Sequence, residues 1–135
     1  MYIDTQCLYS NDQAITTTAD STNVFDLAKN SGPGKPVRIL IQVTTTFADG
    51  TSIAIDLETD DNTSFSSLST IASVAAIGVA TLVQGYKYNI NFVPRDMERY
   101  SRLEYTVSGT MTAGNITAGI IYDEQSAFDT TFPPA

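Results

Sequence analysis

Three carboxylates stand at alternate positions near the middle of the chain: Asp56, Glu58 and Asp60, with Asp61 directly after them. Alternate side chains of a β-strand share one face, and a group of carboxylate oxygens is the ligand set that Ca²⁺ prefers. Alternate strand positions are, however, about 6.6 Å apart, which is too far to share one ion without loop ligands. The Asp-rich pattern of the calcium loop is also absent. We therefore interpret these residues as a solvated strand face and expect no metal site.

The chain contains no histidine and a single cysteine, Cys7. Without histidine, the Ser-His-Asp and Cys-His arrangements and the His-based zinc sites are excluded, which removes most routes to acid–base catalysis near neutral pH. A single cysteine cannot form a disulfide within the chain. No pair of carboxylates is marked as a glycosidase pair, and no glycine-rich phosphate loop occurs. We expect neither enzymatic activity nor a cofactor.

Three of the seven basic residues lie close together in the sequence: Arg95, Arg99 and Arg102. The planar guanidinium group binds carboxylates through paired hydrogen bonds, so this segment is a candidate contact for an acidic partner surface. The competing interpretation is a set of local ion pairs with the acidic residues in the same segment, Asp96, Glu98 and Glu104. These neighbours and the net charge of −8 argue against nucleic acid as a partner.

The apolar residues around these side chains recur with a period of two, which is the pattern of half-buried β-strands. The longer alternating runs are residues 37–47, in which Leu40 is an exception, 53–58, 86–92, 103–107 and 116–122. Shorter strands are expected at residues 3–9, 14–18, 24–27 and 68–74. Residues 62–86 contain no charged side chain, but their apolar pieces are too short for a membrane span. We interpret them as two neutral strands and a turn.

Turn residues separate these runs at short intervals, among them Ser31-Gly32-Pro33-Gly34, Asp49-Gly50 and Ser108-Gly109. About eight or nine strands without intervening helices predict an all-β, single-domain antiparallel β-sandwich of the jelly-roll type. We place this sandwich, with its N-terminal segment, at residues 1–125. Residues 126–135 lose the alternation and are predicted to form a flexible C-terminal tail.

Read in order, the chain resembles the small jelly-roll cement, or decoration, proteins that bind the capsids of tailed bacteriophages. The likeness covers about residues 1–122. The strings that carry it are Met1-Tyr2-Ile3-Asp4, Gln13-Ala14-Ile15-Thr16, Ser21-Thr22-Asn23-Val24-Phe25-Asp26-Leu27, Ile39-Leu40-Ile41-Gln42-Val43, Leu57-Glu58-Thr59-Asp60-Asp61 followed by Phe65, Pro94-Arg95, Arg99-Tyr100-Ser101-Arg102-Leu103-Glu104-Tyr105 and Ile116-Thr117-Ala118-Gly119-Ile120. Their specificity comes from their joint occurrence along the chain.

The resemblance implies a structural virion protein that is made in the cytoplasm of a bacterial host and sits on the outer capsid surface. There it would bridge neighbouring copies of the major capsid protein and so stabilise the DNA-filled head. It would also associate with itself, as a homodimer or homotrimer at the symmetry axes of the capsid. Neither a nucleic acid nor a membrane is expected as a partner.

Loops and chain termini are the expected bridging elements, because the core occupies the strand faces. The candidate partner contacts are therefore Tyr2, Ile3 and Tyr9 near the N-terminus, Arg95, Arg99 and Arg102 in the basic segment, and Phe128 and Phe132 in the tail. Reversing the charge of Arg99 and Arg102 is expected to weaken retention on capsids and to leave the fold intact.

Two other functions share the same fold class. A carbohydrate-binding or receptor-binding β-sandwich module of a phage fibre would carry an aromatic-lined groove or a bound Ca²⁺. An enzyme with an unusual catalytic set would bring carboxylates with perturbed pKa values together in a pocket.

Overall fold

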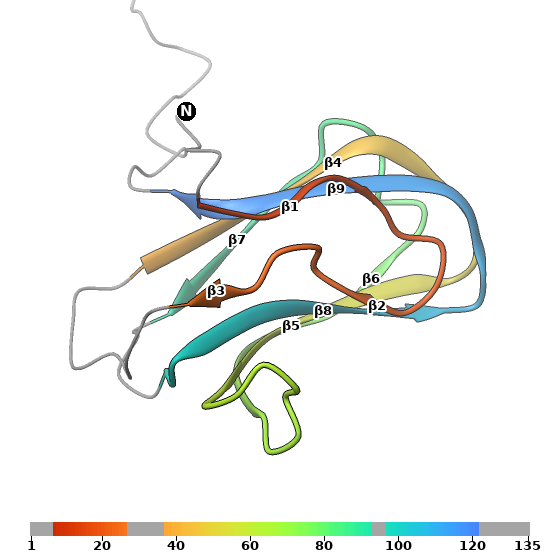
Figure 1. Cartoon of the computed structure of the whole chain (residues 1–135). Coiled ribbons are helices and arrows are strands. Elements are labelled where there is room, and N and C mark those ends of the chain that lie inside the picture. Colours follow the sequence, from red (N-terminus) through yellow and green to blue (C-terminus); the bar gives the residue numbers. More distant parts are fainter. Residues whose placement is uncertain (1–6, 27–36, 93–96, 122–135) are drawn as a thin grey trace, which may run out of the picture.

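The computed structural model describes residues 7–26, 37–92 and 97–121, and these residues form nine β-strands. The strands are β1 (Leu8–Ala14), β2 (Ala19–Asp20), β3 (Phe25–Asp26), β4 (Val37–Asp49), β5 (Ser52–Asp60), β6 (Ser69–Gly78), β7 (Lys87–Phe92), β8 (Tyr100–Ser108) and β9 (Met111–Ile121). They build two antiparallel sheets that lie one above the other (Figure 1).

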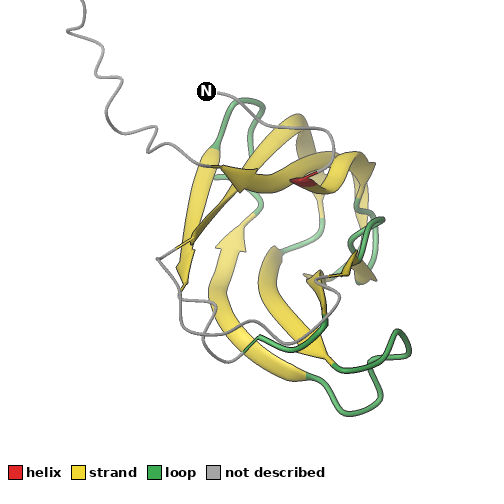
Figure 2. Ribbon diagram, turned by 60° about the vertical axis from the view of Figure 1, so that its left-hand side comes forward, coloured by secondary structure: helices red, strands yellow, loops and turns green. Residues whose placement is uncertain are grey.

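The order of the strands in the sheets identifies the topology. Sheet A has the order β1-β9-β4-β7, and sheet B has the order β2-β8-β5-β6, with β3 paired to β8 as well. The chain passes repeatedly from one sheet to the other, through the loops seen between the two layers in Figure 2. These two orders are those of a jelly roll. The predicted all-β, single-domain sandwich of the jelly-roll type is confirmed.

The core lies between the two sheets and uses one side chain in two from the long strands. The inner faces of the central strands carry Ile39, Ile41 and Val43 on β4, Ile53, Ile55 and Leu57 on β5, Leu103 and Tyr105 on β8, and Ile116 and Ala118 on β9, all 3 % exposed or less. Leu40 breaks the alternation in the sequence, and by position it belongs to the opposite face of β4. It is nevertheless 1 % exposed, although it does not belong to the interior cluster.

Strand boundaries differ from the sequence prediction in several places; β1, for example, runs over Leu8–Ala14 where a strand was predicted at residues 3–9, and β9 begins at Met111 instead of residue 116. The strand predicted at residues 14–18 is wrong, since β1 ends at Ala14 and the two-residue β2 begins only at Ala19. Residues 62–86 hold one strand, β6, between two loops, and the next strand begins at Lys87. No helix in the described part of the chain is long and apolar enough to cross a membrane.

The connection between β4 and β5 shows how turn chemistry directs the chain from one sheet to the other. Asp49 and Gly50 have φ angles of 60° and 66°, a left-handed conformation that glycine adopts freely and aspartate tolerates better than most residues. Two successive residues with positive φ make the tight reversal for which Asp-Gly is a preferred sequence. This turn passes the chain from sheet A to sheet B.

Candidate functional site

Arg102 lies on the outer face of sheet B at the centre of a group of charged side chains. Its Nε donates a hydrogen bond to Glu58 Oε2 at 2.9 Å, and its Nη1 donates to Asp20 Oδ2 at 2.9 Å. Strand register places them together, because Glu58 is directly opposite Arg102 on β5 and Asp20 lies on β2, along the other side of β8. We call Arg102, Asp20, Glu58, Glu104 and the adjacent Phe65 the arginine cluster.

Phe65 covers the arginine cluster from the loop that follows β5, residues 61–68. The Cζ atom of Arg102 lies 4.2 Å from the centroid of the Phe65 ring, within the range of a cation–π attraction. The side chain of Glu58 is only 4 % exposed and that of Arg102 is 18 % exposed. The prediction that Asp56, Glu58 and Asp60 form a solvated face is therefore wrong for Glu58 and Asp60, both of which are buried.

Asp60 fixes the first turn of the 61–68 loop. Its carboxylate accepts hydrogen bonds from the backbone N–H groups of Asp61 (2.6 Å) and Ser67 (2.8 Å), and from Ser67 Oγ (3.1 Å). Burial alone would favour the protonated acid, but these hydrogen bonds to the charged form outweigh burial and lower the pKa of Asp60. The loop that carries Phe65 is thus held by an ionised carboxylate at neutral pH.

Carboxylates do meet near this loop, but not in the alternating set considered from the sequence. One oxygen each from Asp60, Asp61 and Glu98 lies within 4.8 Å of the other two. The oxygens of Asp60 already accept hydrogen bonds from the loop. The described geometry therefore gives Asp60 a structural task, and we assign no metal-ligand role to this group.

Glu104 is the titratable residue of the arginine cluster with the most informative pKa. A hydrogen bond with Glu58 contributes most to raising this pKa, followed by burial and by the negative charges of Glu58 and Asp20, while Arg102 lowers it. The result is a pKa of about 7. Below about pH 7, the carboxyl group of Glu104 thus keeps a proton that it donates to Glu58.

We expect the variant Glu104→Gln to gain stability over the wild type as the pH rises. In the wild type the pKa of Glu104 is about 7 in the folded state and 4.5 in the unfolded state. Between these pH values the unfolded protein has released the proton and the folded protein has not, so the free energy of unfolding falls as the pH rises. Glutamine mimics the protonated acid but has no proton to release in this pH range. The two proteins should be similar at pH 4.5, and the variant should be more stable by about 1–2 kcal/mol at pH 8, since solvent screens a half-buried group.

Urea denaturation at pH 4.5, 6 and 8 measures this difference, and NMR titration of the Glu104 carboxyl carbon locates its pKa. A stability difference that stayed constant across this pH range would show that Glu104 does not hold the proton.

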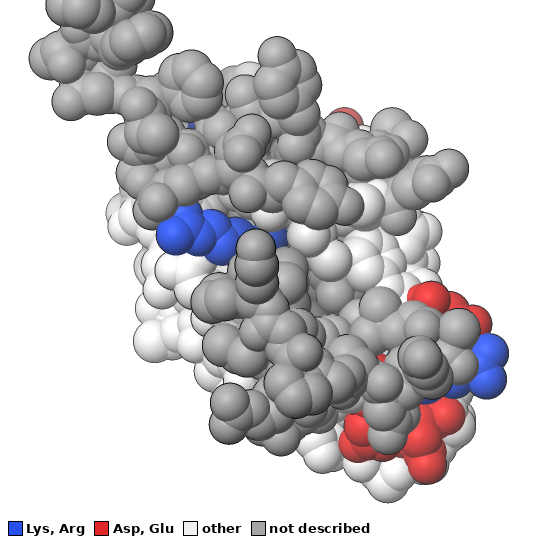
Figure 3. Space-filling model, turned by 90° about the vertical axis from the view of Figure 1, so that its left-hand side faces the viewer, with Lys and Arg blue, Asp and Glu red and all other residues white. Residues whose placement is uncertain are grey.

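Arg99 forms a second, exposed ion pair beside the arginine cluster. Its Nε and Nη2 donate to the two carboxylate oxygens of Asp26 at 2.8 and 3.1 Å, and this bidentate pair raises the pKa of Arg99. Asp26 reaches this position because it lies on β3, directly opposite Tyr100 of β8. Figure 3 looks onto this end of the sandwich and shows acidic and basic side chains side by side at its lower right.

The ion-pair partners of the arginines come from other strands. The described structure pairs Arg99 with Asp26 and Arg102 with Asp20 and Glu58. For Arg99 and Arg102 the interpretation as intramolecular ion pairs holds in kind, but with Asp26, Asp20 and Glu58 in place of the sequence neighbours Glu98 and Glu104. Arg95 and Asp96 lie outside the described residues. Partner contact through Arg99 and Arg102 stays a prediction. A charge reversal at Arg102 is no longer expected to leave the fold intact, because it would place a carboxylate against the buried Glu58.

Tyr9 was expected to contact a partner, and for its side chain this expectation is wrong. Tyr9 is fully buried, with its ring stacked on Phe25 at a centroid distance of 4.1 Å and its hydroxyl 2.9 Å from Ser101 Oγ. Burial, partly offset by the hydrogen bond with Ser101, raises the pKa of this tyrosine. Through Phe25 of β3 and Ser101 of β8, Tyr9 joins β1 to sheet B.

The other candidate contacts fall on Tyr2, Ile3, Arg95, Phe128 and Phe132, which all lie outside the described residues, as does the boundary of the predicted tail. The sequence interpretation missed three members of the arginine cluster as partners of Arg102: Asp20, Glu58 and Phe65. The one available indication was the alternation of β5 and β8, which puts Glu58 and Arg102 on the outer faces of their strands. The register that pairs them is not encoded in that pattern.

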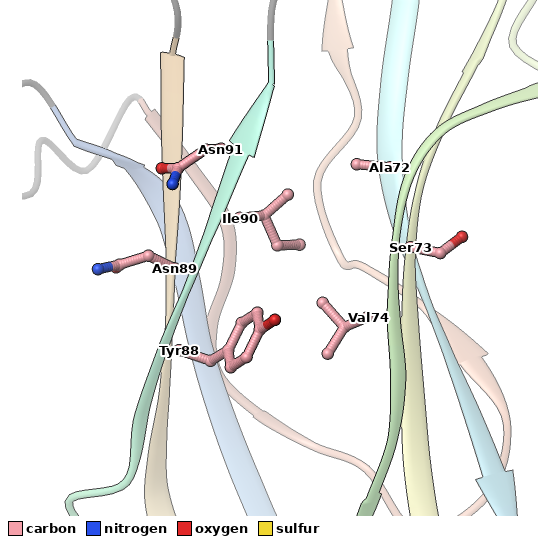
Figure 4. Close-up of a pocket in the computed structure, with 7 residues that line it drawn as sticks. All are labelled: Ala72, Ser73, Val74, Tyr88, Asn89, Ile90 and Asn91. Atoms are coloured by element: carbon pink, nitrogen blue, oxygen red, sulfur yellow. The ribbon is translucent and has the colours of Figure 1, made fainter.

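A pocket of about 260 Å³ lies at the other edge of sheet B, away from β2. It is formed between β6, the edge strand of sheet B, and β7, the edge strand of sheet A. It is lined by Ala72, Ser73 and Val74 of β6 and by Tyr88, Asn89, Ile90 and Asn91 of β7 (Figure 4). These seven residues include no acid and no base, so the pocket lacks the convergent carboxylates of the enzyme hypothesis. Tyr88 is its one aromatic residue, so this pocket is not an aromatic-lined groove for carbohydrate either.

No curated protein matches the chain. The family Bbp16 matches residues 9–120, a range that runs from β1 into β9 and contains the whole arginine cluster. Because this match spans most of the 135 residues, the chain belongs to the Bbp16 family.

Proposed function

We propose that this protein is a capsid cement, or decoration, protein of a tailed bacteriophage. It binds the outer surface of the capsid, bridges neighbouring copies of the major capsid protein, and associates with itself as a homodimer or homotrimer at symmetry axes. In this role it is a structural component of the virion and performs no catalysis.

One observation carries the proposal: sequence strings by which the chain resembles cement proteins converge in space. Asp26, Glu58, Phe65, Arg99 and Arg102 each belong to such a string. Asp26 of β3 pairs with Arg99, which directly precedes β8, while Glu58 of β5 and Phe65 of the 61–68 loop both contact Arg102 of β8. The resemblance therefore includes residues that build one surface at one end of sheet B, which is what a shared binding role requires.

The rigidity of this end of sheet B supports an adhesive role. Arg102 has its guanidinium held by two carboxylates and a ring, and the 61–68 loop is held by Asp60. A surface that is ordered before binding loses little conformational entropy on binding, so more of its contact energy appears as affinity. Such a surface suits a protein whose task is to hold two others in a fixed geometry.

Bridging stabilises a shell by mass action. A ligand that binds only correctly placed neighbours stabilises that placement by about 2.7 kcal/mol at a hundredfold excess over its Kd. Each half of the contact can be weak while the combined contact is tight, because the second half forms at a high effective concentration. Repeated over a capsid, this resists the outward pressure of packaged DNA.

We expect DNA-filled particles that lack this protein to release their DNA at a lower temperature than complete particles. Adding the purified full-length protein should restore the release temperature, because binding stabilises the closed shell. Fluorescence of a DNA-binding dye during a temperature ramp measures the release. Heat-denatured protein is the control. An unchanged release temperature at saturating protein would contradict the proposed function.

A further inference from the structure

β6 is an edge strand with an unusual composition. In the described structure β5 is its only hydrogen-bonded neighbour, so the other side of β6 presents backbone groups to the surroundings. Exposed edges are commonly protected by charged side chains or proline. β6 has neither, and no charged residue occurs anywhere in residues 62–86.

Two bulges limit where β6 can pair. Its register against β5 shifts by one residue between Thr70 and Ala72 and again between Val74 and Ile77, each time through an extra residue in β6. Bulges interrupt the regular pattern of edge hydrogen bonds. The regular stretch between them is Ala72–Ser73–Val74, and these same three residues form the β6 wall of the pocket.

The pocket is matched to a peptide backbone. Most of the surface that it exposes is polar, although its side chains include Val74, Tyr88 and Ile90. Figure 4 shows Val74, Tyr88 and Ile90 directed into the space between β6 and β7, while Ser73 and Asn89 are directed away from it. Tyr88 is 39 % exposed at this position. An extended strand fits such a lining, because its backbone forms hydrogen bonds with the free backbone groups of β6. One of its side chains then lies between Val74, Tyr88 and Ile90.

We propose that β6 accepts a short extended segment of the shell protein as an added β-strand, paired along Ala72–Ser73–Val74 with one uncharged side chain seated in the pocket. This inference rests on the proposed function and names the contact. The segment is uncharged there because a charge in the pocket would lose its hydration with no opposite charge among the lining residues.

A second copy of this chain is a poorer occupant of the edge. Its own β6 carries the same two bulges, so both short regular stretches would have to align, whereas a segment without bulges has only one bulged strand to match. Each copy also has a net charge of −8, so approach of two copies along so short a contact is opposed by repulsion. Self-association at symmetry axes therefore uses another surface.

The test compares two lysine variants of the full-length protein in binding to shells assembled from the major capsid protein alone. Ala72→Lys places an ammonium group at the edge and pocket, whereas Ala80→Lys makes the same change at an exposed turn beyond β6. We expect Ala72→Lys to raise the Kd for shells about tenfold or more and Ala80→Lys to change it by less than about twofold. Equal binding by the two variants would overturn strand addition at β6.

Hydrogen–deuterium exchange of the wild-type protein provides a measurement that does not depend on folding of a variant. The amides of residues 72–74 should exchange about tenfold more slowly on shells than in the free protein. Unchanged exchange on shells overturns the proposal, as does slower exchange that appears in the free protein as its concentration rises, which would assign the edge to a second copy. Failure of the wild-type protein to bind shells at all would contradict the proposed function itself.

Discussion

Replacing Arg102 by methionine is expected to lower the free energy of unfolding by about 3 kcal/mol at pH 7. The guanidinium group is the cation that Glu58 contacts, and the Glu58 side chain is only 4 % exposed. Methionine keeps much of the side-chain volume against Phe65 but leaves the Glu58 carboxylate without a partner of opposite charge. Removing one member of a buried ion pair is costly because the remaining charge has lost its hydration.

The pH dependence of this loss follows from the direction in which Arg102 acts on its neighbours. Arg102 lowers the pKa of Glu104, so its removal raises that pKa further above the unfolded value of 4.5. The cost added through Glu104 therefore develops as the pH rises above about 7, the folded pKa in the wild type, and is absent at pH 5. Urea denaturation of Arg102→Met should show a larger deficit at pH 8 than at pH 5.

Two control variants separate the buried charge from simple loss of a side chain. Arg99→Met removes an exposed ion pair, 44 % and 47 % exposed, and should cost less than about 1 kcal/mol. The double variant Glu58→Gln with Arg102→Met leaves no unpaired carboxylate at position 58 and should recover most of the stability lost in the single variant. A double variant as unstable as Arg102→Met would show that the cost arises from packing.

Replacing Gly114 by alanine is expected to lower the free energy of unfolding by about 3 kcal/mol, from strain in the backbone and overpacking in the core. Gly114 has a φ angle of 140°, in a region that residues with a Cβ rarely adopt. A Cβ at this position would lie 2.2 Å from Cδ1 of Phe47, whose ring is 4 % exposed in the core between the sheets. The ring cannot move away without displacing other core side chains.

Gly78 provides the matched control for the alanine substitution. A Cβ there meets nothing within 4 Å, and no positive φ angle is recorded for this residue. Gly78→Ala should therefore change stability by less than about 1 kcal/mol, in the stabilising direction, because alanine restricts the unfolded chain. Thermal and urea denaturation of both variants measure the difference, and equal effects would contradict the close packing of Phe47 on Gly114.

Sequence patterns predicted the fold well because alternate side chains of a β-strand lie on the same face, so apolar residues at every second position indicate a strand with one buried face. Ile39, Ile41, Ile53 and Ile55 recur at every second position and were assigned to strands, and their side chains lie in the core. The Asp49-Gly50 pair likewise predicted a turn, and both residues adopt positive φ. The predicted strand at residues 14–18 failed, because the alternation of so short a run does not specify a hydrogen-bonding neighbour.

The arginine cluster could be predicted only in part. Arg99 and Arg102 were recognised, with Arg95, as a basic segment, but their ion-pair partners are set by the packing of strands that are distant in the sequence. Burial of Glu58 could not be derived from its strand, since its contact with Arg102 comes from β8 and Arg102 is in turn packed against Phe65 of a loop. Alternation places Glu58 on the outer face, and only the tertiary structure shows that this part of the outer face is covered.

The most direct test of a role in the capsid is to count this protein in purified infectious particles. Quantitative mass spectrometry with isotope-labelled peptides of this chain and of the major capsid protein gives the ratio of the two. The proposed function predicts a fixed ratio that persists through repeated density-gradient purification. Absence of the chain from purified particles, or an amount that falls with each purification step, would contradict it.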